Sequence, residues 1–315
     1  MKIFAGFVIV IIVGGVLYYT SNERIIVAEQ TVYIENLPRS FENFKILQIA
    51  DLHEKRFGNN QQRLTETING ITYDAVVITG DLLDQETSTN FDPAYELLDG
   101  ITLPANTWFV KGNTDPNAYQ PPEERTQEIP EFIEGLEKRG VKQLDSIEVV
   151  EKNGDSMIFA DFEMILRNST EYKPAAQNQY AAQLDEDMQM LNSLEENTPL
   201  ISLFHYPLAD VRLDIYEADE NIKLPPIDLH IAGHYHGGQI RIPLFGALIV
   251  PEAYYDNYGL FPDQDRIRGL WEYNNLKQYV STGLGASNTL GIFKFRLFNP
   301  PEVNLITLKS NTIND

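Results

Sequence analysis

Short apolar runs that each end at a polar side chain set the pattern of this chain. Three of them lie within the first 112 residues: FKILQIA (44–50) before Asp51, DAVVITG (74–80) before Asp81, and TWFVKG (107–112) before Asn113. The stretches NNQQRLTETINGITY (59–73) and PAYELLDG (93–100) lie between the runs and have the polar and apolar faces of helices. Strands that alternate with helices predict an α/β fold, and such sheets bind ligands at the carboxyl ends of their strands.

Further strand signals follow in the second half of the chain. They are LISLF (200–204), DLHIA (228–232), KQYVST (277–282) and VNLITL (303–308), which together predict a second sheet. Before them, PEFIEGLEKRG (130–140) predicts a helix, and the segment 146–163 predicts a hairpin that turns at Asn153-Gly154. The polar segment 168–197 favours a long helix.

Four of the five histidines gather in short motifs that suit metal binding. They are His53 in DLH, His205 in LFHYP, and His234 and His236 in GHYHGGQ. Each motif alone also has an ordinary interpretation as a turn, a helix cap or a strand end, but two imidazoles flanked by three glycines form a tight loop that presents both rings. The fifth histidine, His230, is interpreted as a strand residue with a hydrogen-bond partner. Because the chain has no cysteine, a metal would be held by His, Asp, Asn or Glu, which suit Mn²⁺, Fe and Zn²⁺.

The charge balance argues against a nucleic-acid partner. The chain has 46 acidic and 24 basic residues and a net charge of -22, so a polyanion would be repelled.

The N-terminus predicts an anchor. Residues 3–19 contain no charge and, as a helix, would cover about 25 Å, close to the thickness of a bilayer core. A cleaved signal peptide and a buried helix remain alternatives. We therefore expect a transmembrane anchor over residues 1–21, a juxtamembrane segment over 22–40 and one catalytic domain over 41–315, at the cell membrane and with the domain outside the cytoplasm.

Taken in order, the motifs resemble the pattern D-x-H, GD, GNH, H, GHxH of the calcineurin-like metallophosphoesterase family. The resemblance covers residues 44–310, and GHYHGGQIRIP, YVSTGLGAS and FRLFNPPEVNLITL are similar to its membrane-anchored branch of the YkuE and YaeI type. It implies a four-layer α/β/β/α sandwich. It also implies two divalent ions, with Mn²⁺ favoured over Fe or Zn²⁺: Asp51, His53 and His236 would hold one ion, Asn113, His205 and His234 the other, and Asp81 would bridge them.

The implied activity is that of a phosphoric ester hydrolase. A hydroxide between the two ions would attack a phosphomonoester, phosphodiester or pyrophosphate, on a small molecule or a lipid-linked substrate of the cell envelope. The chain departs from the family at Thr114, where the pattern has the histidine that protonates the leaving group, and Asp115 is the candidate substitute. Asp81, Asn113 and Asp115 are thus the expected catalytic residues.

Two other hypotheses remain open. The protein could be a metal-binding but catalytically weak scaffold or sensor, or a cytoplasmic nucleotide pyrophosphatase with inverted topology. Specificity is expected from the loops 116–127 and 252–268.

Overall fold

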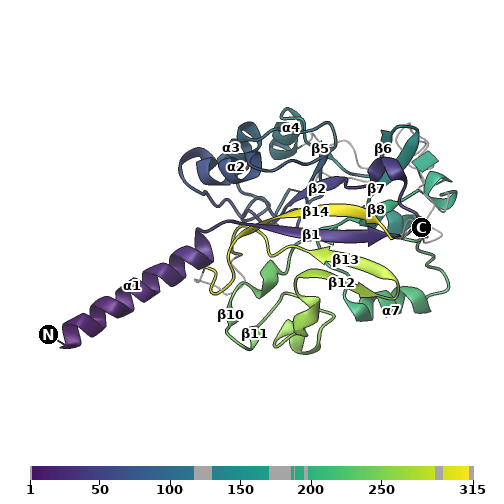
Figure 1. Ribbon diagram of the computed structural model, residues 1–315. Helices are drawn as coiled ribbons and strands as arrows, with labels where there is room; N and C mark the ends of the chain where they lie inside the picture. The colour runs from purple at the N-terminus through teal and green to yellow at the C-terminus, as the bar shows by residue number, and fades with distance from the viewer. Residues whose placement is uncertain are drawn as a thin grey trace.

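Two six-stranded sheets pack face to face in the computed structural model (Figure 1). The structure describes residues 2–116, 130–169, 186–187, 189–194, 198–287 and 294–311. The first sheet has the order β1 (Ile26–Ile34), β14 (Glu302–Ser310), β2 (Lys45–Ile49), β3 (Ala75–Ile78), β4 (Thr107–Phe109), β5 (Lys142–Gln143). The second has the order β12 (Gly269–Tyr273), β13 (Leu276–Val280), β9 (Leu229–Ala232), β8 (Leu200–Leu203), β7 (Asp155–Asp161), β6 (Ile147–Lys152).

The central strands are parallel and almost wholly apolar. In the first sheet β2, β3 and β4 run parallel, and in the second β7, β8 and β9 do so. Strands of this kind are buried on both faces, which is why their sequences are continuous apolar runs rather than alternating ones. Between the sheets, Trp108 of β4 stacks on Phe159 of β7 with ring centroids 4.5 Å apart.

Helices cover the outer faces of both sheets. Helices α2 (Gln62–Asn69), α3 (Asp92–Gly100) and α4 (Glu131–Glu137) pack on the first sheet. Helices α5 (Phe162–Ser169) and α7 (Asp210–Ala218) pack on the second. The layers therefore follow the order α/β/β/α.

Short elements complete the fold. They are η1 (Arg39–Phe41), η2 (Asn59–Gln61), η3 (His236–Gly238), η4 (Asp256–Gly259), η5 (Gln264–Arg266) and a small hairpin of β10 (Arg241–Ile242) and β11 (Gly246–Ala247).

Several local predictions are confirmed, and two segments behave differently. The hairpin turns at Asn153-Gly154, where both residues have positive φ as an Asn-Gly turn requires. The segment VNLITL does not join the second sheet but forms β14 of the first. Residues 22–40, expected only to connect, contribute β1, which pairs with β14 over its whole length. Neither pairing could be anticipated locally, because the partners are separated by most of the chain. The long helix predicted over 168–197 lies largely outside the described residues.

Helix α1 (Lys2–Asn22) projects from the body of the molecule (Figure 1). Among the described residues, no helix has both the length and the apolar character that crossing a membrane requires. The transmembrane anchor predicted over residues 1–21 is therefore unsupported.

Candidate metal centre

The predicted ligands all lie in loops that follow strands. Asp51 and His53 follow β2, Asp81 follows β3, Asn113 follows β4, His205 follows β8, and His234 and His236 follow β9. Because the two sheets face each other, these loops from separate sheets meet at one edge of the sandwich.

One group of side chains comprises Asp51, His53, Asp81 and His236. Their candidate ligand atoms all lie within 4.8 Å of one another. His53 Nε2 lies 3.2 Å from His236 Nε2 and 3.5 Å from Asp81 Oδ2. All four residues are at most 3% exposed. Water from the bulk solvent therefore cannot supply hydrogen bonds to their polar atoms.

A second group comprises Asp81, His205 and His234, and it shares Asp81 with the first. His205 Nε2 lies 3.0 Å from His234 Nδ1 and 3.4 Å from Asp81 Oδ2. The Oδ1 atom of Asn113 lies 3.1 Å from the same Nε2 atom. Asn113 is exposed, so this group lies nearer the solvent than the first.

This geometry fits two divalent cations. Ligand atoms about 2.1 Å from one ion lie about 3.0–3.4 Å apart in octahedral or tetrahedral geometry, close to the separations seen here. Asp51 Oδ2 is buried without a hydrogen-bond partner, as expected of a ligand oxygen in a site that takes a cation. Imidazole, carboxylate and amide donors together suit Mn²⁺, Fe or Zn²⁺.

Hydrogen bonds from the backbone aim the ligand atoms. His205 Nδ1 donates to the carbonyl of Thr79 at 2.8 Å, which leaves Nε2 for a metal. The backbone N–H of Thr114 donates to Asp81 Oδ1 at 2.9 Å, so that Oδ2 is the oxygen that faces both histidine groups.

Two glycines make room for the Asp81 loop. A Cβ on Gly112 would lie 2.0 Å from Asp81 Oδ1, and a Cβ on Gly80 would lie 2.4 Å from the nitrogen of Gly112. Gly80 also has a φ of +84°. A side chain at either position would displace the carboxylate that the two groups share.

Burial controls the charge state of the site. Burial lowers the pKa of His53, His236 and His234, the last to about 3, and neutral imidazole is the form that binds metal. Burial also lowers the pKa of His205, but the adjacent Asp81 carboxylate outweighs it and raises the value to about 9. Burial raises the pKa of Asp81, but His205 and His53 outweigh it and hold the carboxyl well below its usual range.

Asp115 is bound in a different way from the other acidic residues. Its Oδ2 accepts the N–H groups of Asp81 at 2.7 Å and Gly112 at 2.9 Å, and its Oδ1 accepts those of Leu82 and Leu83. Burial raises its pKa to about 6, as a proton donor would need, yet the residue is 0% exposed and both oxygens are engaged by the backbone. This geometry is that of a residue that positions the Asp81 loop, and it does not support the predicted role of Asp115 as a proton donor.

Thr114 does not supply a substitute either, because its hydroxyl donates to the carbonyl of Leu83 at 2.8 Å. His230 is confirmed as a buried strand histidine: its Nδ1 lies 3.0 Å from Ser202 Oγ and its Nε2 lies 3.3 Å from the carbonyl of Tyr206.

A network behind His236 was missed in the sequence. The buried guanidinium of Arg296 donates to the carbonyls of Thr282, Gly285 and Asn299, and Asn299 Nδ2 donates to the carbonyl of His236 at 2.6 Å. The only signal was an arginine and an asparagine in the apolar stretch FRLFNPP, which does not reveal what they contact.

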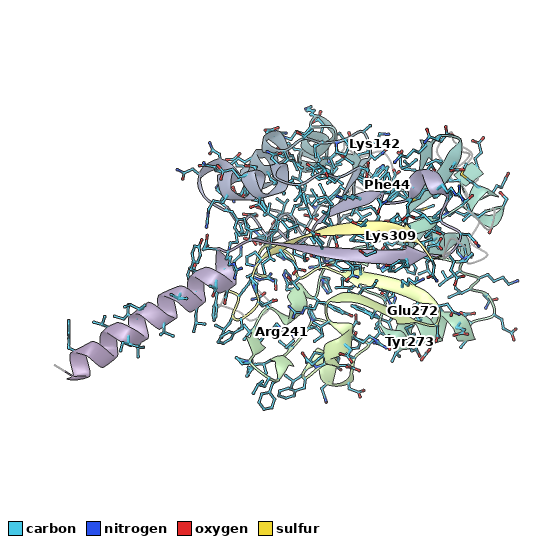
Figure 2. The ribbon with its side chains drawn as sticks, viewed as in Figure 1. Phe44, Lys142, Arg241, Glu272, Tyr273 and Lys309 are labelled. Atoms are coloured by element: carbon cyan, nitrogen blue, oxygen red, sulfur yellow. The ribbon has the colours of Figure 1, made fainter. Side chains whose placement is uncertain are left out.

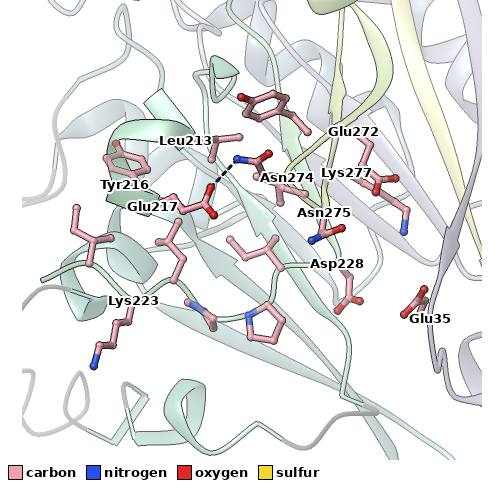
Figure 3. Close-up of a pocket in the computed structure, with 17 residues that line it drawn as sticks. Glu35, Leu213, Tyr216, Glu217, Lys223, Asp228, Glu272, Asn274, Asn275 and Lys277 are labelled. Carbon is pink, nitrogen blue, oxygen red and sulfur yellow. Dashed lines mark hydrogen bonds between the residues drawn. The ribbon is translucent and has the colours of Figure 1, made fainter. Parts of the chain in front are cut away.

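The expected specificity loops are only partly visible. Beyond Pro116, the loop 116–127 lies outside the described residues, whereas the carbonyl of Pro251, just before the second loop, accepts from His234 Nε2 at 3.0 Å. A separate cavity of about 840 Å³ lies beside α7 and the start of β13 (Figure 3). It contains none of the metal-centre residues, and Asn274 at its rim donates to Glu217.

Curated relatives and a family model both match the chain. It is 24% identical to an uncharacterised metallophosphoesterase of Bacillus subtilis, YkuE, with 94% of this chain and 91% of that protein covered. It is 25% identical to the phosphodiesterase YaeI of Escherichia coli, with 84% and 82% covered. A transmembrane protein with a metallophosphoesterase domain from Danio rerio is 25% identical, with 68% of this chain and 45% of that protein covered. The model of the calcineurin-like phosphoesterase family matches residues 44–238, which include all of the predicted ligands, and the chain therefore belongs to this family.

Proposed function

We propose that the protein is a metal-dependent phosphoesterase with a two-metal centre. The observation that carries this proposal is that the Asp81 carboxylate belongs to both ligand groups. One cation would be held by Asp51, His53 and His236, and the other by Asn113, His205 and His234, with Asp81 between them.

The cations, when bound, would clamp a phosphoryl group and lower the pKa of water to supply a nucleophile at neutral pH. The protein supplies the geometry: Thr114 and Asp115 fix the Asp81 loop, and Thr79 fixes the ring of His205. Asn113 is exposed, and we propose that its Nδ2 donates a hydrogen bond to a phosphoryl oxygen at the mouth of the site.

The substrate should have a good leaving group. Neither the Thr114 hydroxyl nor the enclosed Asp115 carboxyl is placed to protonate a departing oxygen, and loss of a general acid costs about 10²–10⁴ in rate. A phosphate or an aryloxide leaves without such help, so we propose pyrophosphate bonds and activated diesters over alkyl esters.

We further propose that the protein acts at a membrane. The apolar side chains of α1, such as Phe4 and Val10, are 72% and 69% exposed, and one relative is described as a transmembrane protein. Lipid-linked phosphates of the cell envelope are the substrate class that such a location favours, with the domain outside the cytoplasm.

The test is hydrolysis of bis-p-nitrophenyl phosphate by the full chain, with Mn²⁺ or with a chelator. Asp81→Asn should lose turnover and bind fewer than two metal ions per chain by elemental analysis. Asp155→Asn, at the opposite end of the second sheet, is the matched control and should keep both. Two bound ions without turnover on this ester or on a pyrophosphate would instead favour the metal-binding scaffold.

A further inference from the structure

Exposed apolar side chains gather on the β10–β11 hairpin and the loops beside it. The hairpin patch consists of Ile242, Leu244, Phe245, Tyr258, Leu260, Phe261 and Phe298. Leu244 is fully exposed, and Phe245 and Phe261 are 77% and 72% exposed. Outside α1 and this patch, no large apolar side chain among the described residues exceeds 51% exposure. Single exposed apolar residues are ordinary, but a contiguous group marks an interaction surface.

The patch draws on three segments of the chain, 242–245, 258–261 and 298, which lie beside one another. Leu244, Phe245 and Phe298 line one shallow hollow together with Arg241. Phe261 joins them because its backbone N–H donates to the carbonyl of Leu248 at 2.8 Å, next to β11. Figure 2 shows Arg241 on the lower side of the molecule, near the end from which α1 projects.

Backbone geometry does not explain why bulky residues occupy these turns. Leu244, Tyr258, Phe261 and Phe298 have φ values of +71°, +54°, +55° and +51°. Glycine or asparagine fits such positions with less strain, and the side chains of Leu244, Tyr258 and Phe261 stay mostly exposed, so they gain little burial in return. The exposed side chains themselves must therefore serve a purpose outside the fold.

We propose that the hairpin patch inserts into the surface of a lipid bilayer beside α1. The Phe298 N–H donates to Ser21 Oγ at 2.9 Å, so the patch adjoins the last turn of α1. The segment 237–251 contains Arg241 and no carboxylate, although the whole chain has a net charge of -22. An uncharged, protruding group of aromatic and aliphatic tips suits the interface of a membrane.

This proposal rests on the membrane location proposed above, and it adds the surface of the protein that would contact the bilayer. His236 and Ile242 are six residues apart, so the metal centre can lie no more than about 22 Å along the chain from the inserted hairpin. A bilayer held by the patch would thus present phosphate groups of its lipids close to the metal centre.

The test uses the full chain returned from detergent into phosphatidylcholine vesicles with brominated acyl chains. The two native tryptophans are at most 7% exposed, so a new one on the surface can be followed against them. Phe245→Trp should show a blue-shifted emission and lose fluorescence to the brominated chains. Ile215→Trp, which places the same probe at a half-exposed apolar position on α7, should show neither effect.

A second variant, Leu244→Glu with Phe245→Glu, should lower vesicle binding while metal content and ester hydrolysis in detergent stay unchanged. Binding of the native protein should survive high salt, since adsorption to zwitterionic phosphatidylcholine is not driven by charge. An unquenched Phe245→Trp probe would overturn the proposal. If that probe were instead blue-shifted in proportion to protein concentration without lipid, the patch would join two copies of this chain. Because the readout is fluorescence, failure here is separate from failure of the phosphoesterase activity.

Discussion

Asp115 offers the sharpest test of how the centre is built. Its two oxygens accept four backbone N–H groups, from Asp81, Leu82, Leu83 and Gly112. Asp115→Asn replaces one oxygen by an NH₂ group, so two of these donors face another donor. A buried donor without an acceptor costs about 1–3 kcal/mol, so we expect the free energy of unfolding to fall by about 2–6 kcal/mol.

The same change should weaken metal binding. Asp81 is the shared ligand, and its backbone N–H is one of the groups that Asp115 holds. Substitutions of groups that orient a ligand typically cost 10–100-fold in metal affinity. We expect a loss of Mn²⁺ affinity in this range by calorimetry, together with the loss of stability by urea denaturation in chelator.

Asp228→Asn is the matched control, because that carboxylate accepts one backbone N–H, from Leu200, away from the metal centre. It should keep native metal affinity and lose less stability. The positioning role is refuted if Asp115→Asn keeps both stability and metal affinity but loses turnover together with the basic limb of the pH–rate profile. That result would identify Asp115 as the proton donor after all.

Three further predictions address the leaving group, the shared carboxylate and the buried histidine. Thr114→His should raise hydrolysis of alkyl phosphodiesters by about 10²-fold or more and change that of p-nitrophenyl esters far less, measured as kcat on the two substrate series. Gly112→Ala should lose Mn²⁺ affinity in calorimetry, because its Cβ would lie 2.0 Å from Asp81 Oδ1, whereas Gly140→Ala, with nothing within 4 Å of its Cβ, should not. Burial lowers the pKa of His230 from 6.5 to about 3, so the stability that its neutral form contributes is complete above pH 6.5 and is lost as the pH falls towards 3. Between pH 8 and pH 5 this loss should be about 2 kcal/mol, and urea curves of His230→Gln in chelator should lack that part of the pH dependence.

The parts of the fold that local sequence determines could be predicted. Runs such as DAVVITG become β3, and Asn153-Gly154 makes its hairpin turn, because burial on both faces and a positive φ each leave a mark within a few residues. The meeting of Asp51, Asp81 and His205 could be anticipated as well, since each follows an apolar strand and such loops gather at one edge. The division of the ligands between two metal ions, in contrast, came from the resemblance to a family.

Long-range pairings left no such mark. Strand β1 alternates too weakly to be distinguished from a linker, and only its parallel pairing with β14 places it in the sheet. In the sequence, Asp115 is likewise only an acidic residue close to a predicted ligand. Its role depends on which backbone N–H groups surround it in the fold. Sequence spacing indicates which residue types are near a site, but not which of their atoms remain free.

Helix α1 is joined to the metal centre by the Arg296 network. The Asn22 side chain donates to the carbonyl of Arg296 at 2.9 Å and accepts its N–H at 2.8 Å. The guanidinium of the same arginine holds Asn299, which in turn holds the backbone of His236. The last turn of α1 is therefore part of the domain that carries the ligands, rather than a flexible tether. A truncated protein that starts after Asn22 would leave the Arg296 backbone groups buried without partners, at about 1–3 kcal/mol each. A shortened protein that lacks only the exposed apolar turns of α1 should therefore begin before Ser21. Its metal affinity should match that of the full chain.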